Sequence, residues 1–112
     1  MTLDLLTRLR SALPAARLST APADLGANTL DRSGWIPDGP GPIGVVFARD
    51  AADVQATMRF ATEHAVPVVV RGAGTGLSGA ATATAGSLVL SLAQMNRIVA
   101  LDADDETIVV EP

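Results

Sequence analysis

The 112-residue sequence predicts an α+β fold, in which an N-terminal helix and a long loop precede a βαβ unit, a glycine-rich loop and further strands. Three observations support this fold class. Leucines recur at helical spacing near the N-terminus, a helical segment separates two short apolar runs in residues 43–70, and short apolar runs continue to the C-terminus. We therefore divide the chain into an N-terminal part, residues 1–42, and a second unit, residues 43–112.

The first 42 residues predict one helix followed by a long connection. Thr2 is a suitable N-cap and Pro14 ends the helix. The leucines on one face of this helix are Leu5, Leu6, Leu9 and Leu13. We expect residues 15–42 to be irregular, because they are rich in Ala, Pro, Gly and Asp and finish with three prolines. Those that could approach a ligand are Asp31, Arg32, Trp35 and Asp38. We expect them to pack on the surface instead, with Trp35 anchoring the loop.

Residues 43–70 predict a βαβ unit with a parallel pair of strands. Ile43 to Phe47 form the first strand, and Asp50 caps a helix that runs to about His64. Val68 to Val70 form the second strand, whose uninterrupted apolar character predicts burial on both faces. His64 is the single histidine and lies in the last helical turn, so we expect it to stabilise the helix end rather than to act in catalysis.

Three further strands are predicted at Leu88 to Leu92, Ile98 to Leu101 and Thr107 to Val110. The last two flank an acidic turn, residues 102–106, and predict a hairpin. Because this turn lacks the glycine and the terminal glutamate of a calcium loop, we expect a solvated turn and no metal site.

The amino-acid composition limits the classes of molecule that the protein is expected to bind. The net charge is −4 and the chain has no lysine, which argues against nucleic acid or an anionic membrane surface as the main partner. The absence of cysteine excludes disulfides and thiolate chemistry within the chain. The N-terminus is unlike a signal peptide and no apolar run has the length of a membrane span, so we expect a cytoplasmic protein.

The glycine-rich segment after the second predicted strand is the candidate binding site. Its residues are Arg71, Gly72, Ala73, Gly74, Thr75, Gly76, Leu77, Ser78 and Gly79. Glycines let successive N–H groups converge on one point, which makes an anion site suited to a pyrophosphate. Thr75 and Ser78 add hydroxyl donors. Two roles are open for Arg71, an ion pair with a neighbouring carboxylate or a contact near the phosphates. The alternative for the whole segment is a tight turn without a ligand.

Residues 74–79 also match the GxGxxG pattern of Rossmann domains that bind NAD. That motif must open a long helix. Only residues 80–85 precede Gly86 and the next strand, which is too short for such a helix, so a Rossmann domain is the weaker alternative. A Walker A loop is excluded, because it needs a lysine.

Several segments of the second unit together match a known pattern in the right order. They are Phe47-Ala48-Arg49 with the capped helix of residues 50–64, Pro67 to Gly79, Leu88 to Leu92, Met95 to Ile98 and Val109 to Pro112. With them, residues 43–112 resemble the N-terminal part of the FAD-binding domain of the p-cresol methylhydroxylase and vanillyl-alcohol oxidase type. Within this type, the sequence is most similar to the FAD-linked glycolate oxidase subunit and D-lactate dehydrogenase group.

The resemblance implies FAD as the cofactor, with its pyrophosphate over residues 72–79. Relatives with covalent FAD at this loop have histidine at the position of Thr75, so the resemblance implies non-covalent FAD. It also implies a full-length oxidoreductase acting on a small 2-hydroxy acid, with an electron acceptor that the sequence does not identify. Catalytic residues would lie beyond Pro112, so we assign none within this incomplete domain. The alternative function is a truncated, non-catalytic nucleotide-binding module.

Overall fold

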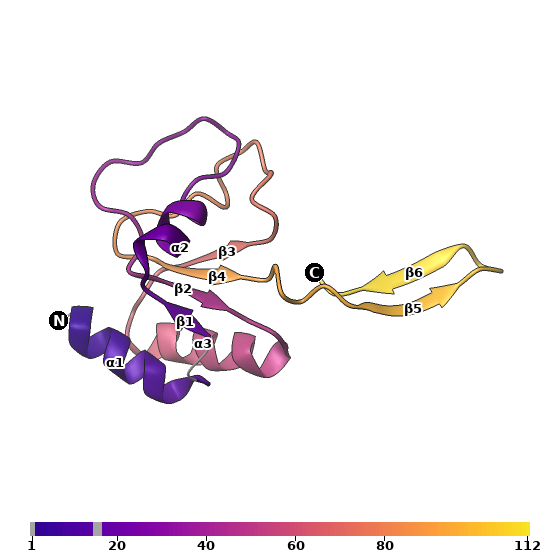
Figure 1. Cartoon of the computed structure of the whole chain (residues 1–112), viewed down its shortest axis with the longest axis horizontal. Helices are drawn as coiled ribbons and strands as arrows, with labels where there is room; N and C mark the ends of the chain where they lie inside the picture. The colour runs from indigo at the N-terminus through magenta and orange to yellow at the C-terminus, as the bar shows by residue number, and fades with distance from the viewer. Residues whose placement is uncertain (1, 15–16) are drawn as a thin grey trace.

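A computed structural model describes residues 2–14 and 17–112 of the chain. Its centre is a sheet of four strands in the order β1-β2-β4-β3 (Figure 1). The strands are β1 (Leu18–Ser19), β2 (Gly44–Phe47), β3 (Val68–Arg71) and β4 (Leu88–Ser91). β1 is antiparallel to β2, whereas β2, β4 and β3 run parallel. The carboxyl ends of the three parallel strands therefore lie at one edge of the sheet.

The strand order corrects two predictions. The predicted βαβ unit is present, but β2 and β3 are not a bonded pair, because β4 lies between them and its Leu88 is opposite both Gly44 and Val68. β4 is buried at all its positions, whereas Val70 in β3 is 51% exposed. The prediction that residues 68–70 are buried on both faces is therefore wrong. Continuous apolar character marks both strands, and it cannot distinguish a central strand from an edge strand.

Helices α1 (Thr2–Ala12) and α3 (Ala51–Glu63) cover one face of the sheet (Figure 1). The buried core on this face comprises Leu9, Leu13, Leu18, Val46, Ala48, Phe60, Leu88, Leu90 and Met95. Thr2 is already part of the helix and so is not its N-cap. The predicted cap of α3 is confirmed, because the Asp50 carboxylate accepts a hydrogen bond from the Asp53 N–H at 2.9 Å. His64 is the C-cap of α3 and stacks on Phe60.

The opposite face is covered by α2 (Pro22–Ala27) and by loops. Leu25 of α2 packs with Val45, Val89 and Ala83, which lies in the loop before β4. The connection predicted to be irregular therefore contains β1 and α2. Pro22 starts α2 in the position that proline favours, and β1 is recognisable only through its pairing with β2. Part of that prediction, residues 15 and 16, lies outside the described residues.

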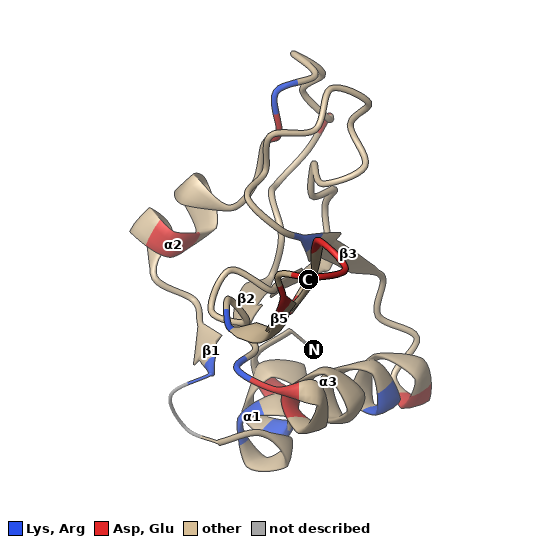
Figure 2. Ribbon diagram, turned by 90° about the vertical axis from the view of Figure 1, so that its right-hand side faces the viewer, with Lys and Arg blue, Asp and Glu red and all other residues tan. Residues whose placement is uncertain are grey.

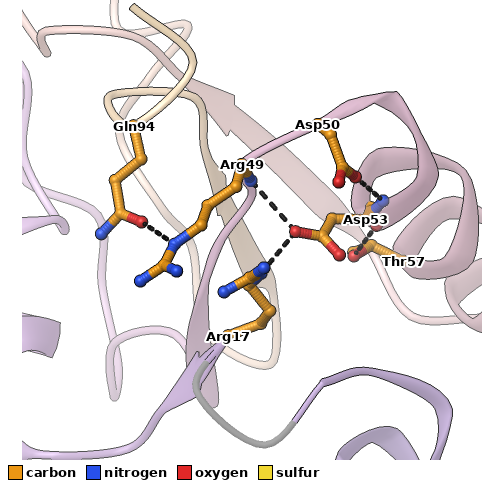
Figure 3. A network of polar contacts seen from close by, with 6 residues as sticks. All are labelled: Arg17, Arg49, Asp50, Asp53, Thr57 and Gln94. Carbon is orange, nitrogen blue, oxygen red and sulfur yellow. Dashed lines mark hydrogen bonds and ion pairs between the residues drawn. The ribbon is translucent and has the colours of Figure 1, made fainter.

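A polar network fixes the segments that leave β2 and β4 (Figure 3). Asp53 is only 4% exposed and accepts hydrogen bonds from the Arg17 side chain and the Arg49 backbone N–H. The Arg49 side chain in turn donates to Gln94 at 3.0 Å. Buried ionised groups need such partners, and here they join the entry to β1, the start of α3 and the segment after β4.

The predicted hairpin is confirmed as β5 (Ile98–Asp102) and β6 (Thr107–Val110), which pair antiparallel with an irregularity after Ile98. It projects away from the rest of the molecule, and all its strand residues are exposed (Figure 1). An ion pair of 2.6 Å between Arg97 and Glu111 closes its base. The hydrogen bonds that Arg97 donates lower the pKa of Glu111 below its ordinary value.

Charged residues are spread over the helices and loops of the described chain (Figure 2). Within residues 2–14 and 17–112, none of the helices has both the length and the apolar character needed to cross a membrane.

Candidate cofactor site

The glycine-rich segment forms a surface loop at the carboxyl end of β3, with Arg71 as the last residue of the strand. Gly74 and Gly79 adopt positive φ angles of 70° and 82°, which glycine accepts without strain. Gly74 is buried and Gly79 partly so, whereas the loop residues Gly72, Ala73, Thr75, Gly76, Leu77 and Ser78 are exposed. The structure thus presents most of the predicted site residues together on one surface.

The backbone of this loop is a set of available donors. Within the described chain, no backbone N–H of residues 73–79 donates a hydrogen bond to a protein acceptor. Consecutive N–H groups of this kind around a positive-φ glycine form a concave anion site. No helix follows the loop before β4, so the arrangement differs from a Rossmann fingerprint. A parallel-strand carboxyl end is also where ligands of open α/β sheets bind.

Arg71 lies beneath the loop rather than in it. Its side chain is buried, and its Nη1 donates to the Leu30 carbonyl at 2.9 Å and to the Ala81 carbonyl at 3.4 Å. Its Nη2 donates to the Ala27 carbonyl at 3.4 Å. None of the ion pairs among residues 2–14 and 17–112 includes Arg71, so the predicted alternative of a carboxylate partner is wrong.

The glycines of the loop meet different surroundings. A Cβ on Gly74 would lie 2.1 Å from Arg71 Nη2, so the guanidinium itself requires glycine at this position. A Cβ on Gly76 would lie 3.8 Å from Asp31 Oδ2, and one on Gly72 would meet nothing within 4 Å. At Gly72 and Gly76, therefore, the chain leaves room that a ligand could approach.

Residues 27–35 form a second wall, which we call the N-terminal wall, along the same loop. The Arg32 N–H donates to the Gly76 carbonyl at 3.0 Å, and the Ala83 N–H donates to the Thr29 carbonyl at 2.8 Å. Trp35 packs on Gly79, because a Cβ there would lie 3.3 Å from its ring. The sequence predicted surface packing for Asp31, Arg32 and Trp35, with Trp35 anchoring the loop, and the position of Trp35 beside Gly79 agrees with that anchoring role. A Trp beside polar turn residues in a long connection was the available signal.

Asp31 gives this wall a permanent negative charge. Hydrogen bonds from the Ser33 side chain and backbone N–H lower the pKa of Asp31 from 3.8 to about 2. Its Oδ2 atom is buried and has no hydrogen-bond partner among the described residues. Asp31 is thus ionised at neutral pH, and the attraction for an anion at this site must come from the loop N–H groups and nearby arginines.

A hollow of about 330 Å³ adjoins the start of the loop. Gly72 and Ala73 line one side of it, and Asn96, Glu111 and Pro112 at the base of the hairpin line another. Within the described residues, no group of three or more His, Cys, Asp or Glu side chains is placed to hold a metal ion. The loop thus offers backbone N–H groups without protein acceptors next to a partly apolar hollow.

A loop with available N–H groups at the carboxyl end of a parallel strand is typical of domains that bind a nucleotide-type cofactor. Comparison with known families agrees, because a family model described as an FAD binding domain matches residues 42–112. The chain belongs to this FAD binding domain family, of the p-cresol methylhydroxylase type, as the sequence predicted. FAD is accordingly its cofactor.

Similar proteins support this membership. D-2-hydroxyglutarate dehydrogenase of Xanthomonas citri pv. viticola is 42% identical over 92% of this chain, and the chain spans 21% of that protein. Glycolate oxidase subunit GlcD of Bacillus subtilis is 37% identical over 63% of this chain and 15% of its own length. A solved alkyldihydroxyacetonephosphate synthase has the same fold, with a TM-score of 0.77 and 15% identity over 95% of this chain and 21% of its own. The chain thus spans about a fifth of the length of such relatives.

Proposed function

We propose that residues 72–79 bind the pyrophosphate of FAD non-covalently, in the first part of an oxidoreductase that oxidises a small 2-hydroxy acid. The observation that carries this proposal is the run of N–H groups from Ala73 to Gly79, which faces no protein acceptor in the described chain. A pyrophosphate offers acceptor oxygens and two negative charges, which match such donors.

Each part of the loop has a role in this proposal. Gly72 and Gly76 let the backbone approach the phosphates, since a Cβ on Gly72 would meet no protein atom within 4 Å and one on Gly76 would meet only Asp31 Oδ2, at 3.8 Å. The exposed hydroxyls of Thr75 and Ser78 add side-chain donors. Leu77 is 78% exposed and supplies an apolar surface beside the phosphates, and Arg71 acts from beneath. Thr75 offers no ring nitrogen for a covalent flavin link.

Two relatives support the proposed substrate class. They act on D-2-hydroxyglutarate and on glycolate, which share a hydroxyl on the carbon next to a carboxylate. FAD, when bound, supplies a hydride acceptor for oxidation of that hydroxyl. Residues of this chain hold and orient the cofactor, and we assign none of them a catalytic role.

The test uses the complete polypeptide in which these residues occur. We expect the purified protein to retain FAD, seen as a flavin absorption spectrum. Anaerobic addition of glycolate, D-lactate or D-2-hydroxyglutarate, one at a time, should bleach that spectrum for at least one acid. Succinate, which has no hydroxyl, is the matched control. Absence of retained FAD contradicts the proposal. Retained FAD with no bleaching by any hydroxy acid would favour the non-catalytic nucleotide-binding module.

A further inference from the structure

Arg71 is a buried cation without an anionic partner in the described chain. Arg71 is 8% exposed, and all its hydrogen bonds go to backbone carbonyls. Placing a charge inside a protein is costly when no opposite charge accompanies it. Carbonyl dipoles offset part of this cost but leave the net positive charge in place.

The three carbonyls belong to segments that are far apart in the sequence. Ala27 and Leu30 lie in or beside the N-terminal wall, more than 40 residues before Arg71, and Ala81 follows the glycine loop. A guanidinium has a planar array of N–H donors, so it can bridge several acceptors that one ammonium group cannot reach in the same geometry. Arg71 thus joins the glycine loop to the N-terminal wall.

The Arg71 guanidinium also lies next to Gly74, one of the loop residues whose N–H groups have no protein acceptor in the described chain. Nη2, Cζ and Nε of Arg71 are the three atoms nearest to the position of a Cβ on Gly74, at 2.1, 2.5 and 2.9 Å. Gly74 is the second residue of the run from Ala73 to Gly79, whose N–H groups face no protein acceptor in the described chain. A charge in a poorly solvated position acts over such short distances with little screening.

We propose that Arg71 is a positioning residue for the cofactor's pyrophosphate: it fixes the shape of the glycine loop by bridging Ala27, Leu30 and Ala81, and it places behind the loop a positive charge that has no carboxylate within ion-pair distance in the described chain. This role rests on the proposed binding of FAD by residues 72–79. It also makes residues 27–35, which precede the segment matched by the family model, part of the cofactor site.

The test compares FAD affinity of Arg71→Ala with that of the parent protein, in the complete polypeptide after removal of bound flavin. Arg59→Ala is the matched control, because Arg59 is an exposed arginine on α3. We expect Arg71→Ala to raise the Kd for FAD by about tenfold or more and Arg59→Ala to leave it within about twofold. Unchanged affinity in Arg71→Ala overturns the inference.

Chemical rescue separates charge from shape. Millimolar guanidinium should restore much of the affinity lost in Arg71→Ala, whereas urea, which is planar and donates to carbonyls but is neutral, should not. Equal rescue by urea, or no rescue by guanidinium, contradicts the electrostatic part of the role.

A second pair of variants serves if Arg71→Ala does not fold. Arg71→Lys keeps the charge and Arg71→Gln removes it, so we expect Arg71→Lys to bind FAD several-fold more tightly than Arg71→Gln. Equal affinities would overturn the proposal. A parent protein that binds no FAD contradicts the proposed function instead, so the two failures are distinguishable.

Discussion

The glycine loop, residues 72–79, and the β5–β6 hairpin are both exposed, but they expose different chemistry. The loop presents backbone N–H groups, and it rests on the buried Arg71 side chain and the N-terminal wall. The hairpin has a paired backbone, and its apolar side chains face solvent, with exposures from 54% to 73%. Arg97 and Glu111 close its base through their ion pair, a hydrogen bond from the Arg97 N–H to the Glu111 carboxylate and one backbone hydrogen bond.

Exposed groups have different meanings in these two regions of a chain that spans about a fifth of the length of its relatives. Unsatisfied donors on a well-supported loop indicate a ligand site. Apolar side chains on a paired ribbon indicate a surface that other protein usually covers. The glycine loop is therefore the candidate ligand site, whereas the exposed side chains of the hairpin do not by themselves indicate a function.

The largest expected effect is complete release of FAD when the protein is denatured. Thr75 offers no covalent attachment, so acid denaturation of the flavin-loaded complete polypeptide should release all of the FAD into the supernatant. Flavin absorbance of the supernatant and the pellet measures this. Flavin that remains with the precipitated protein would contradict non-covalent binding by the loop.

A pair of strand variants sharpens the contrast between the sheet and the hairpin. Leu90 in β4 is 1% exposed and Val109 in β6 is 54% exposed. Leu90→Ala should lower the free energy of unfolding by about 2–5 kcal/mol, because it leaves a cavity. Val109→Ala should change it by less than about 0.5 kcal/mol. Urea unfolding followed by circular dichroism measures both, and similar losses for the two variants would show that the hairpin is packed in solution.

The next effect tests the support beneath the loop. Gly74→Ala places a Cβ against the Arg71 guanidinium at a positive φ, whereas Gly86→Ala has a similar φ of 75° and no atom within 4 Å. Strain from the φ angle is common to both, at about 1–3 kcal/mol. Gly74→Ala should therefore be the more destabilising of the two in thermal unfolding. Equal losses would mean that Arg71 yields without cost.

The smallest expected effect is a pH dependence of the N-terminal wall. The pKa of Asp31 is lowered from 3.8 to about 2 in the folded chain, so folding favours its ionised form. Its stabilising contribution is complete above about pH 4 and is lost as the pH falls toward 2. Asp31→Asn should remove this part of the pH profile, whereas Glu111→Gln removes only the separate contribution at the hairpin base. A profile that is identical in Asp31→Asn and the parent would refute the assignment.

Local signals in the sequence predicted much of the fold. The Asp50 cap with α3, the leucine face of α1 and the β5–β6 hairpin depend on residues close in sequence, and the structure confirms them. The place of β4 between β2 and β3 depends on pairing between distant segments, and no periodicity encodes it. Division of the chain at residue 42 stays a prediction.

The candidate site likewise has features that local sequence predicts and features that depend on contacts between distant segments. Glycine spacing predicted an anion loop, which stays a prediction, and the family comparison confirms FAD as the cofactor. The inward position of Gly74 was not predictable, because it depends on the Arg71 side chain. Two partners of that side chain lie 41 and 44 residues earlier in the chain, so the contact between Arg71 and the N-terminal wall could be found only from the structure.

The central claim is that the exposed side of the glycine loop contacts the pyrophosphate of FAD, and Gly76→Ala tests it most directly. A Cβ there meets only an ordinary contact of 3.8 Å within the protein, and a Cβ on Gly41 meets a contact of the same length, so Gly41→Ala is the matched control. In the complete polypeptide, titration with FAD should give a Kd raised about tenfold or more for Gly76→Ala, with an unchanged unfolding temperature, and a Kd within about twofold of the parent for Gly41→Ala. Equal FAD affinity in both variants would contradict the claim.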